Sequence, residues 1–202
     1  MINWRTNVEA DALMVESLVG KLRTDAYKSR EGFYTSYWEP NVLERPEVTF
    51  APLYKGIIGQ CMSHLGLQDR MGYSFDHWAQ LYDSTDGGHL VHDHYAPAVI
   101  ASWVHFVQPA STSKFHFFRG DGSKVYPKQK KGDFIVFDSW RLHAVDPTNE
   151  GEDRLVIAGN VYANSVYSPN AYDDTVSLIA FKNIYEAQET HPQNHIDWSK
   201  YL

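Results

Sequence analysis

The first third of the chain has the residue spacing of amphipathic helices. Leu13, Leu18 and Leu22 are separated by polar residues, which predicts a helix from Glu9 to Leu22. A second helix is predicted from Pro52 to Leu67, with its apolar residues on one face: Leu53, Ile57, Ile58, Cys61, Met62 and Leu65. Between the two helices, Arg30–Pro46 is rich in Tyr, Trp, Pro and Glu, which indicates an irregular segment that covers part of the fold.

Beyond Gly72 the pattern changes to that of short strands. Turn residues separate the apolar or alternating segments at intervals of roughly 8–12 residues, a spacing typical of a β-sandwich or barrel rather than of βαβ units. The predicted strands are Ser74–Tyr82, Ala98–Val107, Ser113–Phe118, Lys124–Pro127, Phe134–Phe137 and Arg154–Val161. Ala98–Val107 is continuously apolar, as expected of a central strand that is buried on both faces. The predicted fold class is therefore mainly β.

The chain shows no internal repeat and no linker rich in Pro, Gly or Ser, so residues 1–202 are interpreted as a single domain. Residues 1–72 form a helical and irregular flank, and residues 73–163 form the β core. Residues 164–202 form a polar and aromatic C-terminal extension, with a candidate strand at Thr175–Phe181.

Composition excludes several classes of protein. With 18 basic and 25 acidic residues the net charge is −7, which argues against general nucleic-acid binding. The single cysteine, Cys61, excludes an internal disulfide framework and a zinc site built from thiolates. The amino terminus lacks the pattern of a signal peptide, and no segment approaches the ~18 consecutive apolar residues of a membrane span. The expected location is cytoplasmic.

Histidine is the unusual component, because five of the ten histidines fall between His77 and His105. In the segment Gly87–Tyr95, an extended backbone would place His92 and His94 on one face and Asp93 on the other. Two imidazoles so placed can bind a common first-row metal ion, with His143, just after a buried strand, as the candidate third ligand. The alternative interpretation is that these histidines are ordinary surface residues of a turn.

Arg154 leads a buried apolar strand, and a buried guanidinium needs an anionic partner. That partner is either a nearby carboxylate, such as Asp138 or Asp153, or a bound dicarboxylate gripped through two parallel hydrogen bonds.

The histidines, Arg154 and the residues around them resemble the sequence motifs of a known protein family. The motifs that carry the resemblance are His92-Asp-His94, Ser102–Phe106, Gly132–Pro147 and Arg154, within about Phe75–Tyr162. They are similar to those of the iron(II)/2-oxoglutarate oxygenases, and more narrowly to the prolyl 4-hydroxylase-like branch that is common in bacteriophages. The resemblance implies a double-stranded β-helix, or jelly roll, with the N-terminal helices packed on the sheet and Fe(2+) bound inside its mouth.

The resemblance also assigns roles. It implies that His92 and His143 are iron ligands and that Arg154 binds the far carboxylate of the co-substrate 2-oxoglutarate. Tyr82 matches a tyrosine whose hydroxyl points at the co-substrate, and Asn160 matches a polar residue that faces the site. Phe106 stands where relatives often have a tyrosine that binds the co-substrate.

One position departs from the family, because His94 occupies the place of the usual Asp or Glu ligand. Three interpretations remain open here. The site is a triad of three histidines, or a local bulge turns Asp93 inward as the ligand, or His94 lies outside the metal's ligand shell and water completes it.

The expected activity is hydroxylation of a small-molecule or peptide substrate, with decarboxylation of 2-oxoglutarate to succinate. Two alternatives are a cupin-like metal-binding or structural jelly roll without catalysis, and a three-histidine dioxygenase that does not use 2-oxoglutarate. The sequence does not indicate the oligomeric state.

The remaining candidate residues have simpler expected roles. Trp78, Trp103 and Trp140 are candidates for the wall of the cavity. Lys128, Lys130 and Lys131 are expected in a solvated hairpin turn. His89 is expected at the surface of a turn, and His105 and His116 as hydrogen-bonded sheet residues.

Overall fold

The computed structural model describes residues 2–41, 44–67, 71–83, 85, 87–96 and 99–166. Both predicted helices are present, as α1 (Ala12–Leu22) and α2 (Ala51–His64). Helix α1 begins after Asp11, whose carboxylate accepts hydrogen bonds from the backbone N–H groups of Leu13 and Met14. Short 3-10 turns occupy Asp25–Tyr27 and Val48–Phe50. No helix in the described part of the chain is long and apolar enough to cross a membrane.

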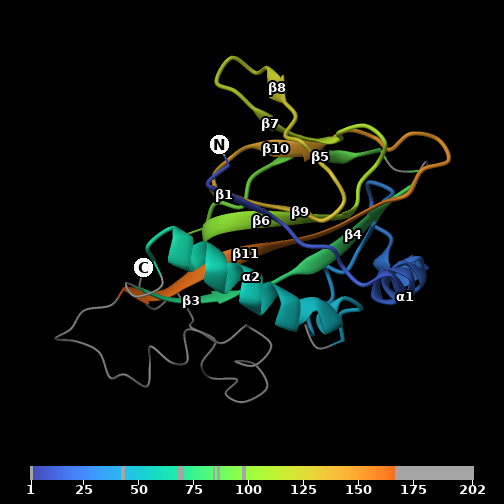
Figure 1. Ribbon diagram of the computed structural model, residues 1–202. Helices are drawn as coiled ribbons and strands as arrows, with labels where there is room; N and C mark the ends of the chain where they lie inside the picture. The colour runs from blue at the N-terminus through green and yellow to red at the C-terminus, as the bar shows by residue number, and fades with distance from the viewer. Residues whose placement is uncertain are drawn as a thin grey trace.

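The strands form two antiparallel sheets, which confirms the mainly β prediction (Figure 1). The larger sheet has the order β1 (Trp4–Asn7), β9 (Asp133–Phe137), β6 (Val99–Gln108), β11 (Arg154–Val166), β4 (Trp78–Tyr82) and β2 (Tyr34–Thr35), with β3 (Met71–Phe75) also paired to β11. The smaller sheet has the order β5 (His89–His92), β10 (His143–Val145), β7 (Phe115–Phe118) and β8 (Lys124–Val125).

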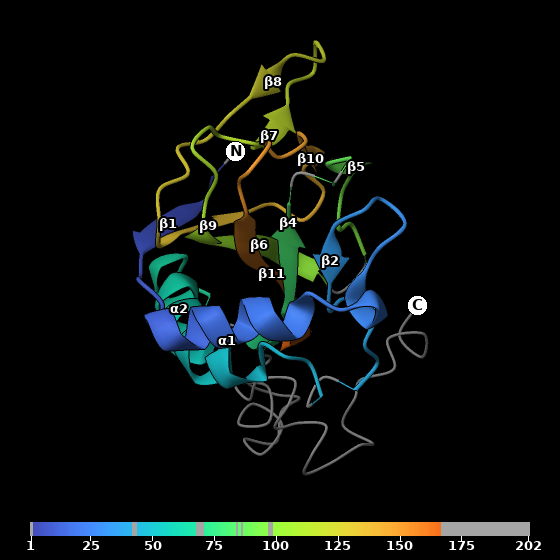
Figure 2. The same ribbon diagram turned by 90° about the vertical axis from the view of Figure 1, so that its right-hand side faces the viewer.

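The larger sheet is covered on both faces, by the two helices on one side and by the smaller sheet on the other (Figure 2). Strand β9 shows the resulting alternation. Phe134 and Val136 join the core under the helices, whereas Ile135 and Phe137 join the core between the sheets. Because both faces are buried, the central strands are apolar at successive positions. This explains the uninterrupted apolar run of β6.

Some sequence-based boundaries were wrong. The predicted strand Ser74–Tyr82 is divided into β3 and β4 at Asp76, whose carboxylate and backbone N–H both bond to the backbone of Asn160. The flank that was expected to be helical and irregular also supplies β1 and β2 to the larger sheet. Leu13, assigned to the apolar face of the first helix, is 76% exposed. The candidate strand Thr175–Phe181 lies outside the described residues.

Candidate metal and co-substrate site

A cavity of about 490 Å³ lies between the two sheets, within the usual size range of small-molecule sites. Strand β11 supplies one wall, because every second residue from Arg154 to Tyr162 lines the cavity. The smaller sheet supplies His92 and His143 from its two paired strands β5 and β10. The cavity therefore joins elements that are far apart in the sequence.

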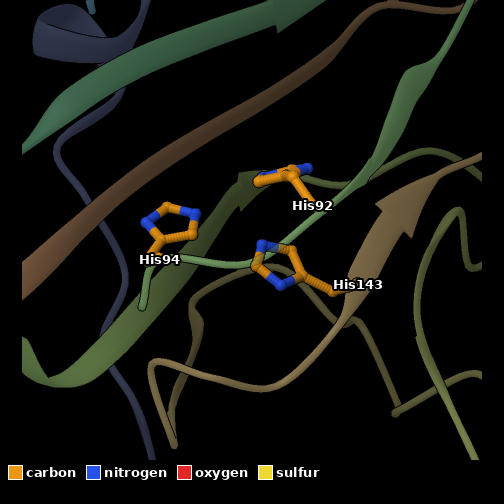
Figure 3. Close-up of side chains that lie close together, drawn as sticks. All are labelled: His92, His94 and His143. Carbon is orange, nitrogen blue, oxygen red and sulfur yellow. The ribbon is translucent and has the colours of Figure 1, made fainter. Parts of the chain in front are cut away.

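The structure brings His92, His94 and His143 together in this cavity. One ring nitrogen from each lies within 4.8 Å of the others, and Figure 3 shows the three imidazoles turned toward one another. His92 and His143 are direct cross-strand partners in the β5–β10 pair. His94 lies just after β5, where its backbone N–H donates to the carbonyl oxygen of Ser139 at 2.8 Å. Strand pairing and this loop contact together fix the three rings.

Each of these histidines uses Nδ1 for a hydrogen bond to an oxygen acceptor. His92 Nδ1 donates to the carbonyl oxygen of Leu90 at 2.8 Å, and His143 Nδ1 donates to that of Arg141 at 2.8 Å. His94 Nδ1 lies 2.9 Å from the side-chain oxygen of Asn160. A protonated Nδ1 leaves the lone pair on Nε2, which is the arrangement that orients histidine ligands in metal sites. The donor set is therefore three neutral nitrogens, which suits a first-row transition metal.

Burial keeps these imidazoles uncharged. Desolvation lowers the pKa of His143 to about 2 and that of His94 to about 4, and repulsion from the neighbouring histidines contributes to both shifts. Desolvation also lowers the pKa of His92. All three rings are neutral at physiological pH, in the form that binds a metal ion.

Asp93, the alternative ligand, is exposed at the mouth of the cavity. Its Oδ1 accepts a hydrogen bond from the backbone N–H of Tyr95 at 3.1 Å. Among the described residues, the cluster with metal-binding geometry contains His94 rather than Asp93. The structure thus brings His94, and not Asp93, together with His92 and His143.

Arg154 lines the same cavity and is 1% exposed. Its guanidinium carbon lies 4.8 Å from the ring centre of Tyr82, its cross-strand partner on β4. The two local carboxylates considered as partners of Arg154 bind other residues: Asp153 pairs with Arg23 at 2.6 Å, and Asp138 pairs with Arg141 at 3.7 Å. A buried cation in a cavity is suited to binding an anionic ligand.

Tyr82 is fully buried beneath Arg154 and is not among the residues that line the cavity. Its hydroxyl donates to Gln80 Oε1 at 3.1 Å and lies 3.4 Å from His89 Nδ1. Tyr82 thus packs against Arg154, and its predicted contact with the co-substrate stays a prediction.

Asn160 lies on the cavity face of β11, six residues from Arg154. Its Oδ1 accepts from both His94 Nδ1 and the Ser102 hydroxyl, at 2.9 and 2.8 Å. Asn160 is thus connected to the histidine cluster through His94.

The expectation that His89 lies at the surface of a turn is wrong. His89 lines the cavity, with its ring centre 4.2 Å from that of His92. In the β5–β10 pair His143 is paired with His92, and Val145 is paired with His89. The paired positions are three residues apart on β5 but only two residues apart on β10, so β5 contains one extra residue, a β-bulge. This bulge turns both histidines to one face. It leaves the intervening Leu90 and Val91 exposed at 72% and 55%.

Of the three tryptophans predicted to line the cavity, two do so. Trp78 and Trp103 line the cavity, but Trp140 does not. It is 53% exposed and stacks against the Arg141 guanidinium. His105 in β6 and His116 in β7 are buried and hydrogen-bonded, as expected.

Sequence reasoning missed the aromatic residues at the cavity mouth, Tyr37, Trp38 and Tyr95. The available signal was the aromatic richness of the covering segment Arg30–Pro46 and the Tyr that follows the histidine motif.

The comparisons with solved structures identify the fold. A prolyl 4-hydroxylase from Pseudomonas putida is similar over 79% of this chain and 91% of its own, with a TM-score of 0.56 and 17% identity. The viral collagen prolyl hydroxylase from Paramecium bursaria Chlorella virus-1, solved with 2-oxoglutarate, matches 79% of this chain and 96% of its own, with a TM-score of 0.53 and 14% identity. A prolyl hydroxylase from Trichoplax adhaerens, solved with a hypoxia-inducible factor peptide, matches 87% of this chain and 86% of its own, with a TM-score of 0.57 and 12% identity.

Neither a protein-family model nor a curated protein sequence matches the chain. The likeness therefore lies in the architecture: this chain has the jelly-roll fold of the prolyl hydroxylases and other 2-oxoglutarate-dependent oxygenases, which confirms the predicted fold class.

Proposed function

We propose that this protein is a non-haem iron(II) and 2-oxoglutarate-dependent oxygenase of the prolyl 4-hydroxylase-like branch, and that it hydroxylates a small-molecule or peptide substrate. One observation carries the proposal. In a fold shared with such enzymes, three histidine nitrogens and a buried arginine face the same cavity. The peptide bound to the Trichoplax relative supports a peptide as one possible class of substrate.

The residues fit the implied metal ion and co-substrate. His92, His94 and His143 would hold Fe(2+) through Nε2, because their Nδ1 atoms are engaged with oxygen acceptors. Bound iron supplies the redox chemistry that couples decarboxylation of 2-oxoglutarate to hydroxylation of a C–H bond. Arg154 would bind the far carboxylate of 2-oxoglutarate through a charge-assisted pair of hydrogen bonds.

The surrounding residues orient these groups and exclude water. Tyr82 supports the Arg154 guanidinium from below, and Asn160 holds the ring of His94. Apolar side chains such as Val156 and Phe137 line the rest of the cavity and lower its polarity. A dry cavity strengthens the attraction between Arg154 and a carboxylate.

The cluster of three histidines also supports a second candidate function, that of a dioxygenase that does not use 2-oxoglutarate. Arg154 separates the two, because such an enzyme has no dicarboxylate for it to bind. A metal-binding or structural jelly roll without catalysis would bind iron and show no turnover.

The test is an anaerobic titration of the purified chain with Fe(2+) and then with 2-oxoglutarate. The proposal predicts a weak visible charge-transfer band that requires both additions, and succinate release coupled to oxygen consumption once air is admitted. Iron binding with no band and no succinate would reject the use of 2-oxoglutarate. The His143→Ala variant is the control for non-specific iron binding, because it removes one of the three nitrogens.

A further inference from the structure

Exposed aromatic rings converge on the mouth of the cavity. Trp38 is 75% exposed, Tyr95 74% and Tyr37 46%, and all three line the cavity together with the buried Trp78. Trp78 is 3% exposed and stacks against the ring of His94, with ring centres 5.5 Å apart, so it supports Tyr37 from the interior. We name Tyr37, Trp38 and Tyr95 the aromatic rim. Large rings exposed singly are common on protein surfaces, but several at one cavity mouth indicate a binding surface.

The ring of Tyr37 lies nearly at a right angle to both of its aromatic neighbours. Tyr37 meets Trp38 at 84° and Trp78 at 76°, with ring centres 4.8 and 5.1 Å apart. Rings in this arrangement form a corner rather than a flat stack. Neighbouring rings at right angles direct their exposed faces in different directions, as the rings of ammonium-binding cages do.

A buried arginine holds part of the rim in place. Arg45 is 8% exposed and donates hydrogen bonds to the carbonyl oxygens of His77, Glu39 and Tyr37, at 2.7, 3.1 and 3.4 Å. It thereby ties the segment that carries Tyr37 and Trp38 to the residue before Trp78. Binding to a preorganised surface costs less ordering entropy than binding to a mobile one.

The charge at the mouth is negative. Asp93 is the acidic residue among those described as lining the cavity, and the Tyr95 N–H holds one of its carboxylate oxygens at 3.1 Å. The whole chain carries a net charge of −7, which attracts cations at long range. The Asp93 carboxylate attracts a cationic substrate and repels an anionic one.

We propose that the aromatic rim and Asp93 bind a cationic ammonium group, primary or methylated, on the substrate. This assignment rests on the proposed oxygenase function, because it names the class of molecule that the cavity would accept beside the metal and 2-oxoglutarate. The rings attract the cation through their faces, and the carboxylate of Asp93 supplies the counter-charge.

The experiment measures binding of Nε-trimethyl-lysine by calorimetry, on the full chain with and without Fe(2+) and 2-oxoglutarate. The comparison ligand is its neutral isostere, in which a carbon replaces the ammonium nitrogen. We expect the cation to bind roughly tenfold more tightly, and Trp38→Leu or Asp93→Asn to remove most of that preference. Trp140→Leu is the matched control, because Trp140 is also exposed but lies outside the cavity lining.

Equal affinity for the two ligands, or no binding of either at millimolar concentration, would overturn the proposal. So would an equal loss in Trp38→Leu and Trp140→Leu. The Fe(2+) and 2-oxoglutarate titration on the same samples separates this proposal from the proposed function. If the charge-transfer band forms and the cation is not preferred, only the ammonium site is rejected. If the cation is preferred and no band forms, only the oxygenase assignment is rejected.

Discussion

Replacing Arg154 by leucine tests the part of the site that separates a 2-oxoglutarate enzyme from other metal proteins. The guanidinium is 1% exposed, lines the cavity and lies over the ring of Tyr82. Leucine fills part of the same space with apolar atoms and removes every hydrogen-bond donor. The change is therefore directed at the proposed contact with the 2-oxoglutarate carboxylate rather than at the histidine cluster.

The magnitude follows from the contact that is lost. A hydrogen-bonded contact to a charged group contributes about 1.5–3 kcal/mol. At about 1.4 kcal/mol per factor of ten, affinity for 2-oxoglutarate should fall roughly ten- to a hundredfold. Arg154→Lys should recover only part of the loss, because an ammonium lacks the planar fork that matches a carboxylate. Loss of the cation–π contact with Tyr82 adds about 0.5–2 kcal/mol of destabilisation.

The assay follows 2-oxoglutarate affinity, iron content and melting temperature on one preparation of each variant. We expect iron content to stay at the wild-type value, because Arg154 is not one of the clustered histidines. A lower melting temperature with unchanged 2-oxoglutarate affinity would refute the reasoning, since Arg154 would then be structural only.

Three further predictions concern the metal site and the fold. His143→Ala should lose iron stoichiometry in metal analysis, and retention of a full equivalent would remove His143 from the ligand set. Asn160→Ala should weaken iron binding in a competition titration by roughly 10–100-fold, because the ring of His94 loses its acceptor; unchanged affinity would contradict that support. Burial raises the pKa of Glu47 from 4.5 to about 7. Between pH 4.5 and 7 the carboxyl group of Glu47 stays protonated in the folded state and is ionised in the unfolded state. The free energy of unfolding of the wild type therefore falls as pH rises from 4.5 to 7. Chemical unfolding should show that Glu47→Gln gains about 3 kcal/mol over wild type between pH 4.5 and 7; a difference independent of pH would contradict this.

The part of the site that could be predicted from sequence is the part that follows strand periodicity. Alternation on an extended chain puts His92 and His94 on one side, and the same rule puts Arg154 and Asn160 on one face of β11. The structure brings these residues together, while their roles as ligands and co-substrate contacts stay predictions. Periodicity also indicated the sandwich, because many short apolar segments separated by turns have few other ways to bury their surfaces.

His89 shows where this reasoning fails. Regular alternation turns residues three apart to opposite faces, so His89 was assigned away from His92. The bulge depends on the register between β5 and β10, which are separated by some fifty residues of sequence. Pairing between distant strands is a property of the tertiary structure. The register of β5 with β10 therefore cannot be predicted from the residue types of β5 or from their spacing. The position of Asp93 depends on the same local geometry.

The aromatic rim could not be predicted for a different reason. Tyr37 and Trp38 lie in an irregular segment that Arg45 holds through backbone carbonyl oxygens. Every residue has a backbone carbonyl oxygen, so these contacts cannot be predicted from the types of residue in the segment. The histidine cluster, by contrast, depends on paired strands and on side chains of one type. Substrate recognition at the rim is thus set by loop contacts that can change while the strands and the histidines stay in place. The substrate must therefore be established by binding experiments on the rim, because the fold and the histidine cluster do not determine it.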